Sequence, residues 1–244
     1  MLAKFAGAIK EFGLAAGMLY VADRALRMLS PRLGLFVYEL MAQPIPDKPL
    51  LSANLARKMS FAEIGPGHPA LAVMPVPAAV IRARFDQKAV CLGTWRGDVL
   101  LGYIWLCFGR YIEDEVRCDY LIAEAPGSVF DFDLYILPEH RMGLAFAALW
   151  HGTNEYLRTR GVVRSFSRVT RFNNASRRSH ARFKWQRVGR VLVFVAWRLE
   201  VMLTDIAPYV AVSTSLSDRM QLRLRPAPAV APVPVDTTTN RLKA

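Results

Sequence analysis

Apolar and polar positions alternate in short runs over the middle of the chain, a pattern typical of β-strands. Turn residues separate the runs, and Arg96-Gly97-Asp98 has the composition of a hairpin turn between the first two. The fourth run ends at Pro138, which cannot continue a paired strand. The pattern therefore predicts four strands, at Ala89–Trp95, Val99–Phe108, Val116–Ala123 and Val129–Leu137.

A helical period replaces this alternation after residue 143. Apolar residues recur at helical spacing from Gly143 to Arg160, and Gly161 follows as a C-terminal cap. Strand patterns come next at Val162–Thr170, Val191–Arg198 and Met220–Arg225, with a helix pattern at Asn174–Trp185. Antiparallel strands followed by strand–helix–strand units predict an α+β fold with a mixed sheet. A right-handed crossover is expected to join the fourth and fifth strands.

The two ends of the chain differ from this middle part. Met1–Leu29 has no strong breaker before Ser30-Pro31 and is predicted to be helical, and Leu33–Met41 is a second apolar segment. We expect residues 1–50 to form an N-terminal apolar helical extension that packs on the domain or lies in a membrane interface. Residues 51–225 are expected to form one globular domain, and the Pro/Ala-rich residues 226–244 a disordered tail.

The composition limits the class of protein. Hydrophobic residues make up 53% and charged residues 21% of the 244 positions, which is enough for a core and excludes general disorder. No stretch of 18 or more apolar residues occurs, so a conventional membrane span is not expected. The three cysteines fit a reducing, cytoplasmic compartment, and neither they nor the four histidines have metal-ligand spacing, so no metal site is predicted.

Positive charge is concentrated in one part of the chain. The net charge is +12, and the interval from Arg158 to Arg190 holds eleven basic residues and no Asp or Glu. Such a block suggests a polyanionic partner: a phosphorylated cofactor, an anionic membrane surface or a nucleic acid. A solvated basic face is the alternative.

The junction between the fourth strand and the following helix carries the clearest chemical signal. A basic, polar loop follows the strand, and Gly143 and Ala145 open the helix. Small residues let backbone N–H groups approach a ligand, and a helix N-terminus favours a phosphate. The loop therefore predicts a pyrophosphate cradle, with an ordinary strand–helix connection as the alternative. Its candidate residues are Leu137, His140, Arg141, Met142, Gly143, Leu144 and Ala145.

This loop resembles the signature of the GNAT superfamily of acyl-CoA-dependent N-acyltransferases, which reads Arg/Gln-x-x-Gly-x-Gly/Ala after the fourth strand. Gly143 and Ala145 match it, and His140 stands in place of Arg or Gln. The resemblance covers roughly residues 89–197.

A second similarity to the same family follows the fifth strand. Asn173 and Ser176 fit the family pattern Asn-x-x-Ala/Ser, and His180 stands where the family commonly has Tyr. Lys184-Trp185 stands where Gly-Phe is expected. The resemblance implies that Asn173 and Ser176 join the cofactor-binding set and that His180 returns a proton to the leaving thiolate.

The resemblance also implies the fold and the reaction. The expected fold is GNAT-like: a mixed, mostly antiparallel sheet of six to seven strands flanked by helices, with the extra N-terminal helical segment. Acyl-CoA or acetyl-CoA would lie between the fourth and fifth strands as cosubstrate, with no tightly bound cofactor. A primary amine would then attack the thioester directly. Acyl carrier protein is the alternative donor.

Two carboxylates are the candidates for the base that deprotonates the amine. Strand alternation places Asp131, Asp133 and Tyr135 on one face of the fourth strand. Burial and mutual repulsion would raise one carboxyl pKa towards useful basicity. We expect Asp133, which is nearer the loop, to be the base and Asp131 to be the second candidate. The alternative is that both pair with arginines such as Arg164 or Arg168.

The sequence leaves open which chemical class of amine is the acceptor and which partners the protein binds. A lipid amine such as a sphingoid base suits the apolar N-terminal segments, and a sugar amine or an amino acid is an alternative acceptor. We expect a cytoplasmic protein, with peripheral binding to the inner face of the membrane as an extension of that expectation. Two alternatives compete with the enzyme: a basic protein that binds nucleic acid or another anionic surface, ranked lower, and a non-catalytic scaffold of the same fold.

Overall fold

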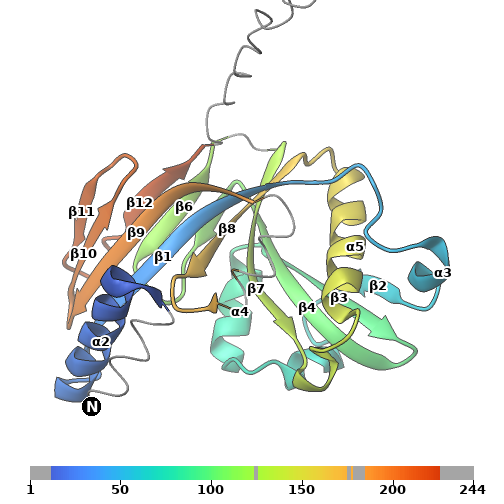
Figure 1. Cartoon of the computed structure of the whole chain (residues 1–244), viewed down its shortest axis with the longest axis horizontal. Coiled ribbons are helices and arrows are strands. Elements are labelled where there is room, and N and C mark those ends of the chain that lie inside the picture. Colours follow the sequence, from blue (N-terminus) through green and yellow to red (C-terminus); the bar gives the residue numbers. More distant parts are fainter. Residues whose placement is uncertain (1–11, 124–125, 175–176, 178–184, 226–244) are drawn as a thin grey trace, which may run out of the picture.

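A single large sheet runs through the molecule (Figure 1). The computed structural model describes residues 12–123, 126–174, 177 and 185–225. The sheet has nine strands in the order β11-β10-β9-β1-β8-β7-β4-β3-β2. All these neighbours pair antiparallel except β7 and β8, which are parallel. The prediction of a mixed, mostly antiparallel sheet is therefore confirmed. The strands are β1 (Leu33–Pro44), β2 (Ser60–Glu63), β3 (Val90–Arg96), β4 (Val99–Phe108), β7 (Ser128–Ile136), β8 (Arg164–Thr170), β9 (Gln186–Ala196), β10 (Leu199–Thr204) and β11 (Val210–Ser213).

A smaller sheet covers part of the large one. Its three strands lie in the order β12-β6-β5, from β5 (Arg110–Ile112), β6 (Cys118–Ile122) and β12 (Met220–Leu224). Side chains of β6 and β12 share a core cluster with those of β1 and β9. The sequence predicted six to seven strands, whereas the described residues contain twelve, because β1, β2, β5, β10 and β11 were missed. The edge strands β2 and β11 and the strand β5 have four residues or fewer, too few to show a period.

Strand β1 corrects the prediction of an N-terminal helical extension. It lies in the middle of the large sheet, paired with β9 on one side and β8 on the other. Its buried residues include Tyr38 and Leu40. The extension prediction is therefore wrong beyond Ser30. A strand that is largely buried reads as a continuous apolar run, which its period alone cannot distinguish from a buried helix.

Helix α2 (Leu14–Leu29) confirms the helical part of that prediction. Gly13, at φ 82°, precedes it. Strand β8 pairs with β1 only from Tyr38 onward, and α2 lies beside the earlier part of β1. There the Asp23 carboxylate accepts the Leu35 N–H at 2.9 Å, in place of a strand neighbour. No helix in the described ranges is long and apolar enough to cross a membrane.

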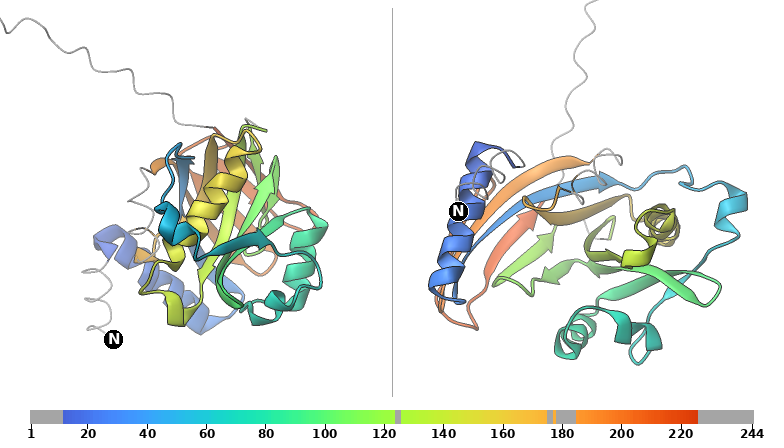
Figure 2. Two further views of the ribbon diagram at one scale, coloured as in Figure 1. Left: turned by 90° about the vertical axis from the view of Figure 1, so that its right-hand side faces the viewer. Right: turned by 60° about the horizontal axis from the view of Figure 1, so that its bottom comes forward.

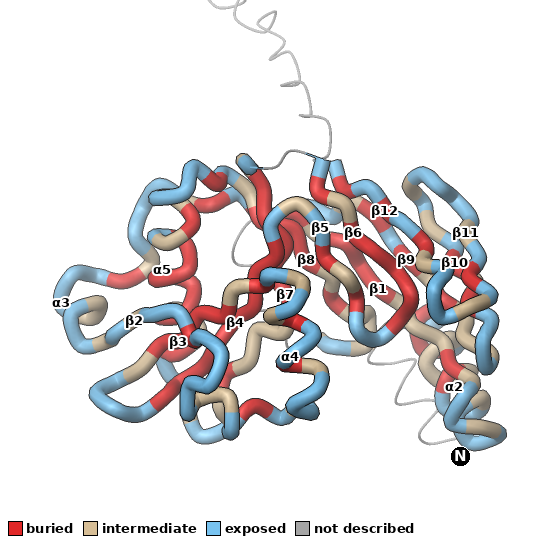
Figure 3. Tube along the Cα trace, turned by 180° about the vertical axis from the view of Figure 1, so that it is seen from behind, coloured by how far each residue is buried: buried red, intermediate tan, exposed pale blue. Residues whose placement is uncertain are grey.

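Helices cover both faces of the large sheet (Figure 2). Helix α5 (Ala145–Arg158) buries Leu149 and Trp150 against one face, with Ile104 and Leu106 of β4. Helix α4 (Ala78–Asp86) packs on the other face, where the Phe85 ring meets Trp105 edge-on at 5.0 Å. Figure 3 shows the buried residues concentrated in the central strands and in α5. Short helices complete the described chain: α3 (Ala53–Ala56), η1 (Pro69–Val73) and η2 (Pro138–His140).

Candidate functional site

The two parallel strands in the middle of the sheet separate halfway along their length. β7 and β8 pair from Ser128 and Arg164 to Asp131 and Ser167, and no further. Beyond that point β7 continues to Ile136 beside β4, and β8 continues to Thr170 beside β1. Their facing backbone groups are therefore left without each other as partners, which provides donors and acceptors for a ligand.

A bulge on β7 marks the place where the strands part. Trp105 of β4 lies opposite Phe132, and Tyr103 lies opposite Tyr135, so two residues of β7 face one residue of β4. Asp133 is in the bulge with φ 46°, a left-handed conformation that is uncommon for a residue with a side chain. A bulge bends its strand, and it also interrupts the alternation of side chains between the two faces.

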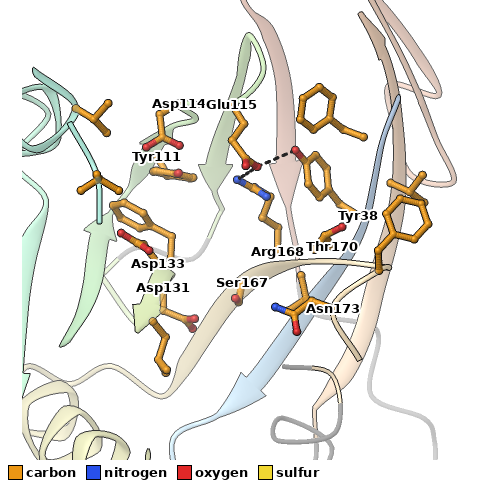
Figure 4. A pocket seen from close by; sticks show the side chains of 18 of the residues that line it. Tyr38, Tyr111, Asp114, Glu115, Asp131, Asp133, Ser167, Arg168, Thr170 and Asn173 are labelled. Atoms are coloured by element: carbon orange, nitrogen blue, oxygen red, sulfur yellow. Dashed lines mark hydrogen bonds and ion pairs between the residues drawn. The ribbon is translucent and has the colours of Figure 1, made fainter. Parts of the chain in front are cut away.

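A cavity of about 630 Å³ lies at this opening (Figure 4). Its walls come from α2, β1, α4, the turn after β5, β7 and β8. Apolar and aromatic side chains alternate with charged ones around it. The volume is in the range of ordinary small-molecule sites.

Asp131 is the buried carboxylate of the site. Its side chain accepts hydrogen bonds from the hydroxyl groups of Ser165 and Ser167 on β8. Figure 4 shows Asp131 and Ser167 beside each other where β7 and β8 part. Burial raises the pKa of Asp131 to about 7, although the two hydrogen bonds oppose the rise. A carboxylate with that pKa can take a proton from an ammonium group near neutral pH.

Asp133 is held in an ion pair instead. Its carboxylate contacts the guanidinium group of Arg84, which also bonds Asp114 at 2.8 Å. Arg84 is buried and lies over the rings of Trp105 and Phe132. The prediction that Asp131, Asp133 and Tyr135 share one face is wrong, because the bulge reverses the alternation between Phe132 and Tyr135. The alternative of an arginine partner holds for Asp133, with Arg84 in place of Arg164 or Arg168.

A second charged group faces the cavity from β8. Arg168 bonds Glu113 and Glu115, and its guanidinium carbon lies 4.3 Å from the centre of the Tyr38 ring. The Tyr38 hydroxyl donates to Glu115 at 3.0 Å. Burial raises the pKa of Tyr38 well above its ordinary value, so this phenol stays protonated. Sequence reasoning missed this group, because three acidic residues in a row, Glu113, Asp114 and Glu115, have the composition of a solvated turn.

Helix α2 supplies a third wall that sequence reasoning did not place at the site. Asp23 and Arg27, one helical turn apart, form an ion pair at 2.8 Å, and both line the cavity. The Arg27 guanidinium lies over the ring of Phe36. The i, i+4 spacing of Asp23 and Arg27 was the available signal.

The loop between β7 and α5 has the form expected of a phosphate site. Residues Pro138–His140 make a short 3-10 turn, and α5 begins at Ala145 without a side-chain cap. A Cβ added at Gly143 would meet only the His140 carbonyl oxygen, at 3.7 Å, so the space above this backbone is open. The first N–H groups of a helix have no acceptor within the helix. Those of α5 therefore remain available to an anion.

The other candidate cofactor-binding residues of this loop are partly buried in the fold and partly exposed. Arg141 donates to the Ile136 carbonyl at 3.0 Å and lies over the Tyr135 ring. Met142 is fully exposed and Leu144 is exposed. The His140 Nε2 atom is buried without a hydrogen-bond partner. Leu137 packs against the aromatic core.

The residues predicted after β8 are only partly described. Asn173 lines the cavity. Ser176 and His180 lie outside the described residues, as does most of the helix predicted at 174–185.

Arginines of the basic block have partners within the fold. Arg171 and Arg177 both contact Glu39, Arg160 contacts Glu63 at 3.4 Å, and Arg158 donates to two backbone carbonyls. The block is therefore not a uniformly solvated surface. Among the described residues no group of three His, Cys, Asp or Glu is arranged to hold a metal.

No protein-family model matches the chain, and no curated protein matches it either. Among solved structures, it is similar to a tandem GNAT protein from the clavulanic acid biosynthesis pathway. The identity is 15% and the TM-score 0.46, over 66% of this chain and 53% of that one. It is also similar to a GNAT-family protein from Novosphingobium aromaticivorans DSM 12444, with 13% identity and a TM-score of 0.45, over 66% of this chain and 64% of that one.

A third similar structure is AAC(6')-Iy in complex with a bisubstrate analogue, with 13% identity and a TM-score of 0.38, over 51% of this chain and 88% of that one. This chain spans about half to two thirds of the length of the two GNAT structures named before it.

Proposed function

We propose that this protein is a GNAT-type N-acyltransferase that moves an acyl group from acyl-CoA to a primary amine. The observation that carries the proposal is Asp131: a buried carboxylate with a pKa of about 7, at the point where β7 and β8 part and on the wall of a cavity. The loop that opens α5 is a phosphate site on the same strand–helix unit. Acetyl-CoA or a longer acyl-CoA would be the cosubstrate, and acyl carrier protein is the alternative donor.

The reaction needs three proton and charge steps. Asp131 takes a proton from the ammonium group of the acceptor, which leaves a nucleophilic amine. The nitrogen attacks the thioester carbonyl, a C–N bond forms, and the C–S bond breaks. Backbone N–H groups freed by the bulge on β7 are suited to stabilise the oxyanion that forms in between. The departing thiolate takes up one proton, and the amide nitrogen loses its second.

The proton donor to the thiolate is a separate part of the proposal. His180 stays the candidate by its place in the sequence. If it fills this role, replacing it with alanine should lower turnover by about 10²- to 10⁴-fold and leave CoA affinity nearly unchanged. Replacing it with tyrosine should recover part of the loss, because a phenol also donates.

Charged side chains around the cavity bear on the acceptor. Arg84, Arg168 and their carboxylate partners form much of its wall. Such a wall favours a polar amine over the alkyl chain of a sphingoid base, because an apolar chain would remove water from these ion pairs and offer them no hydrogen bond in exchange. Peripheral binding of the protein to the inner face of the membrane remains part of the proposal, because it depends on the outer surface of the protein and not on the cavity.

The test is release of free thiol from acetyl-CoA over a panel of primary amines. Wild-type protein should release thiol with at least one amine, and Asp131→Asn should lower turnover by about 10²- to 10⁴-fold. Asp98→Asn, the same change in the exposed turn between β3 and β4, is the matched control and should leave turnover unchanged. Full turnover in a folded Asp131→Asn variant would remove Asp131 from the mechanism. An absence of thiol release from every amine, with CoA bound, would favour the non-catalytic scaffold.

A further inference from the structure

The charges of the described residues on the wall of the cavity do not balance. The cationic side chains among them are three arginines, Arg27, Arg84 and Arg168. The carboxylates among them are five, Asp23, Asp114, Glu115, Asp131 and Asp133. No Lys or His is among the described residues that line the cavity.

Each of the three arginines already has a carboxylate partner. Arg27 pairs with Asp23, Arg84 with Asp114 and Asp133, and Arg168 with Glu115. Arg168 also pairs with Glu113, whose side chain is fully buried directly behind the cavity wall. An anionic group on a substrate would therefore have to compete with these carboxylates for every guanidinium group.

The excess of carboxylates persists when Asp131 is assigned to the reacting amine. Four lining carboxylates and Glu113 then face three guanidinium groups. These carboxylates come from three separate parts of the fold: Asp23 from α2, the run Glu113-Asp114-Glu115 from the turn between β5 and β6, and Asp133 from β7. One ammonium group at Asp131 cannot lie beside all three.

The sign of this local charge is opposite to that of the protein. The chain carries a net charge of +12, so an acidic cavity is not a reflection of its composition. Carboxylates that outnumber the cationic groups of a partly buried site are costly to keep ionised, and a bound cation would offset that cost. Aromatic rings of Tyr111 and Phe172 also line the cavity and can face a cation.

From this imbalance we infer that the acceptor is a polycationic amine, which carries at least one positive group in addition to the amine that is acylated. The inference rests on the proposed function and narrows its substrate class. It disfavours amino acids and phosphorylated sugars, because their anionic groups would meet the excess of carboxylates on the cavity wall.

The test compares three small acceptors of similar length. Butane-1,4-diamine carries a second cation, n-butylamine has none, and 4-aminobutanoate carries an anion instead. With acetyl-CoA as donor, kcat/KM should be at least tenfold higher for the diamine than for n-butylamine, equivalent to about 1.4 kcal/mol, and lowest for 4-aminobutanoate. Higher salt should reduce the advantage of the diamine, because it screens the carboxylates.

Two variants test whether the preference for the diamine over n-butylamine arises in the cavity. Glu115→Gln should reduce the diamine-to-butylamine ratio at least threefold, and Asp114→Asn gives a second, independent change in the same wall. Asp98→Asn removes one exposed carboxylate elsewhere and should leave the ratio unchanged. An unchanged ratio in both cavity variants would overturn the inference.

Failure of the inference differs from failure of the proposed function. If n-butylamine reacts as well as the diamine, acyl transfer stands and the polycationic acceptor is rejected. If no amine releases thiol, calorimetry of the same amines with the CoA-bound protein still decides the inference. Tighter binding of the diamine would support it, and equal binding of diamine and monoamine would overturn it.

Discussion

At the scale of single residues, the fold holds the buried carboxyl group of Asp131 at a cost in stability. Its carboxyl group has a pKa of about 7 in the folded protein against an ordinary value near 3.8. Below about pH 4 both folded and unfolded chains hold the proton, so the group has no effect. As the pH rises from 4 to 7 only the unfolded chain releases it, so the folded state loses stability, and the loss persists above pH 7.

This cost predicts that Asp131→Asn stabilises the protein although it lowers turnover. The asparagine is neutral at all pH values, so the gain should be absent near pH 4 and reach about 2–4 kcal/mol at pH 8. Thermal or denaturant unfolding of both proteins at the two pH values measures it. Asp133→Asn is the contrasting change. It breaks the ion pair with buried Arg84 and should destabilise the fold at pH 8 by about 2 kcal/mol. A less stable Asp131→Asn variant at pH 8 would contradict the assigned burial cost.

The hydrogen bond from Ser165 to Asp131 leads to a prediction about the pH dependence of kcat/KM. Its hydroxyl donates to Asp131 and favours the ionised form, which holds the pKa below the value that burial alone would set. Ser165→Ala should therefore raise this pKa and shift the acidic limb of the kcat/KM profile to higher pH. The profile is measured by thiol release, with Ser217→Ala, at an exposed position, as the control. A limb that stays in place or moves to lower pH would show that Asp131 does not set it.

Sequence reasoning selected both carboxylates but did not find that their surroundings differ. Asp131 and Asp133 were selected because they lie two residues apart in a strand, where alternation puts them on one face. The bulge at Asp133 cancels that rule, and its partner Arg84 comes from a helix far away in the sequence. Neither the extra residue nor the long-range ion pair leaves a signal in the local pattern.

At the scale of elements, the loop before α5 was predicted correctly as a strand–loop–helix junction, because proline, glycine and helical period all act locally. Its role in CoA binding remains a prediction. Gly143→Val should lower CoA affinity at least tenfold, about 1.4 kcal/mol, because a branched side chain would occupy the open space above the backbone.

The same glycine makes this test specific. A Cβ at position 143 would meet no atom closer than 3.7 Å, so the variant should unfold at the same temperature as the wild type. Calorimetric titration with CoA gives the affinity. Met142→Ala, a change of an exposed neighbour, is the control for general damage to the loop. Unchanged CoA affinity in Gly143→Val would place the pyrophosphate elsewhere.

Element prediction failed where an element depends on distant partners. Strand β1 was read with the N-terminal helix because Leu33–Pro44 is apolar on both faces over much of its length. Its two neighbours in the sheet come from residues far along the chain, and only they make it a strand. The strands β10 and β11 were missed for a related reason, since they form an exposed hairpin at the edge of the sheet.

At the scale of the whole molecule, charge is separated between two regions. The cavity is acidic, whereas the chain as a whole is strongly basic. In the proposed reaction, a positive field would attract a polyphosphate donor from a distance, and the local carboxylates would act only on the acceptor at short range. The protein would in this way favour two substrates of opposite charge.

The net charge of +12 also underlies the prediction of peripheral membrane binding. Helix α2 exposes Leu14, Met18, Met28 and Leu29, and Arg24 is exposed on the same helix. The protein should sediment with vesicles that contain phosphatidylserine, and higher salt should release it. The double change Met28→Ser and Leu29→Ser should weaken binding, and neutral phosphatidylcholine vesicles are the control. Protein that stays in the supernatant with anionic vesicles at low salt would refute the prediction.

The position of β1 has a consequence for how the chain is made. This strand leaves the ribosome long before β8 and β9, the two strands between which it belongs. At about 5–20 residues per second, it waits on the order of ten seconds with both edges open and its apolar side chains uncovered. An apolar strand in that state is a target for chaperones and for aggregation. Ribosome-stalled chains that end before residue 164 should therefore bind ribosome-associated chaperones and remain unfolded. Chains in which residues up to 196 have left the ribosome should fold.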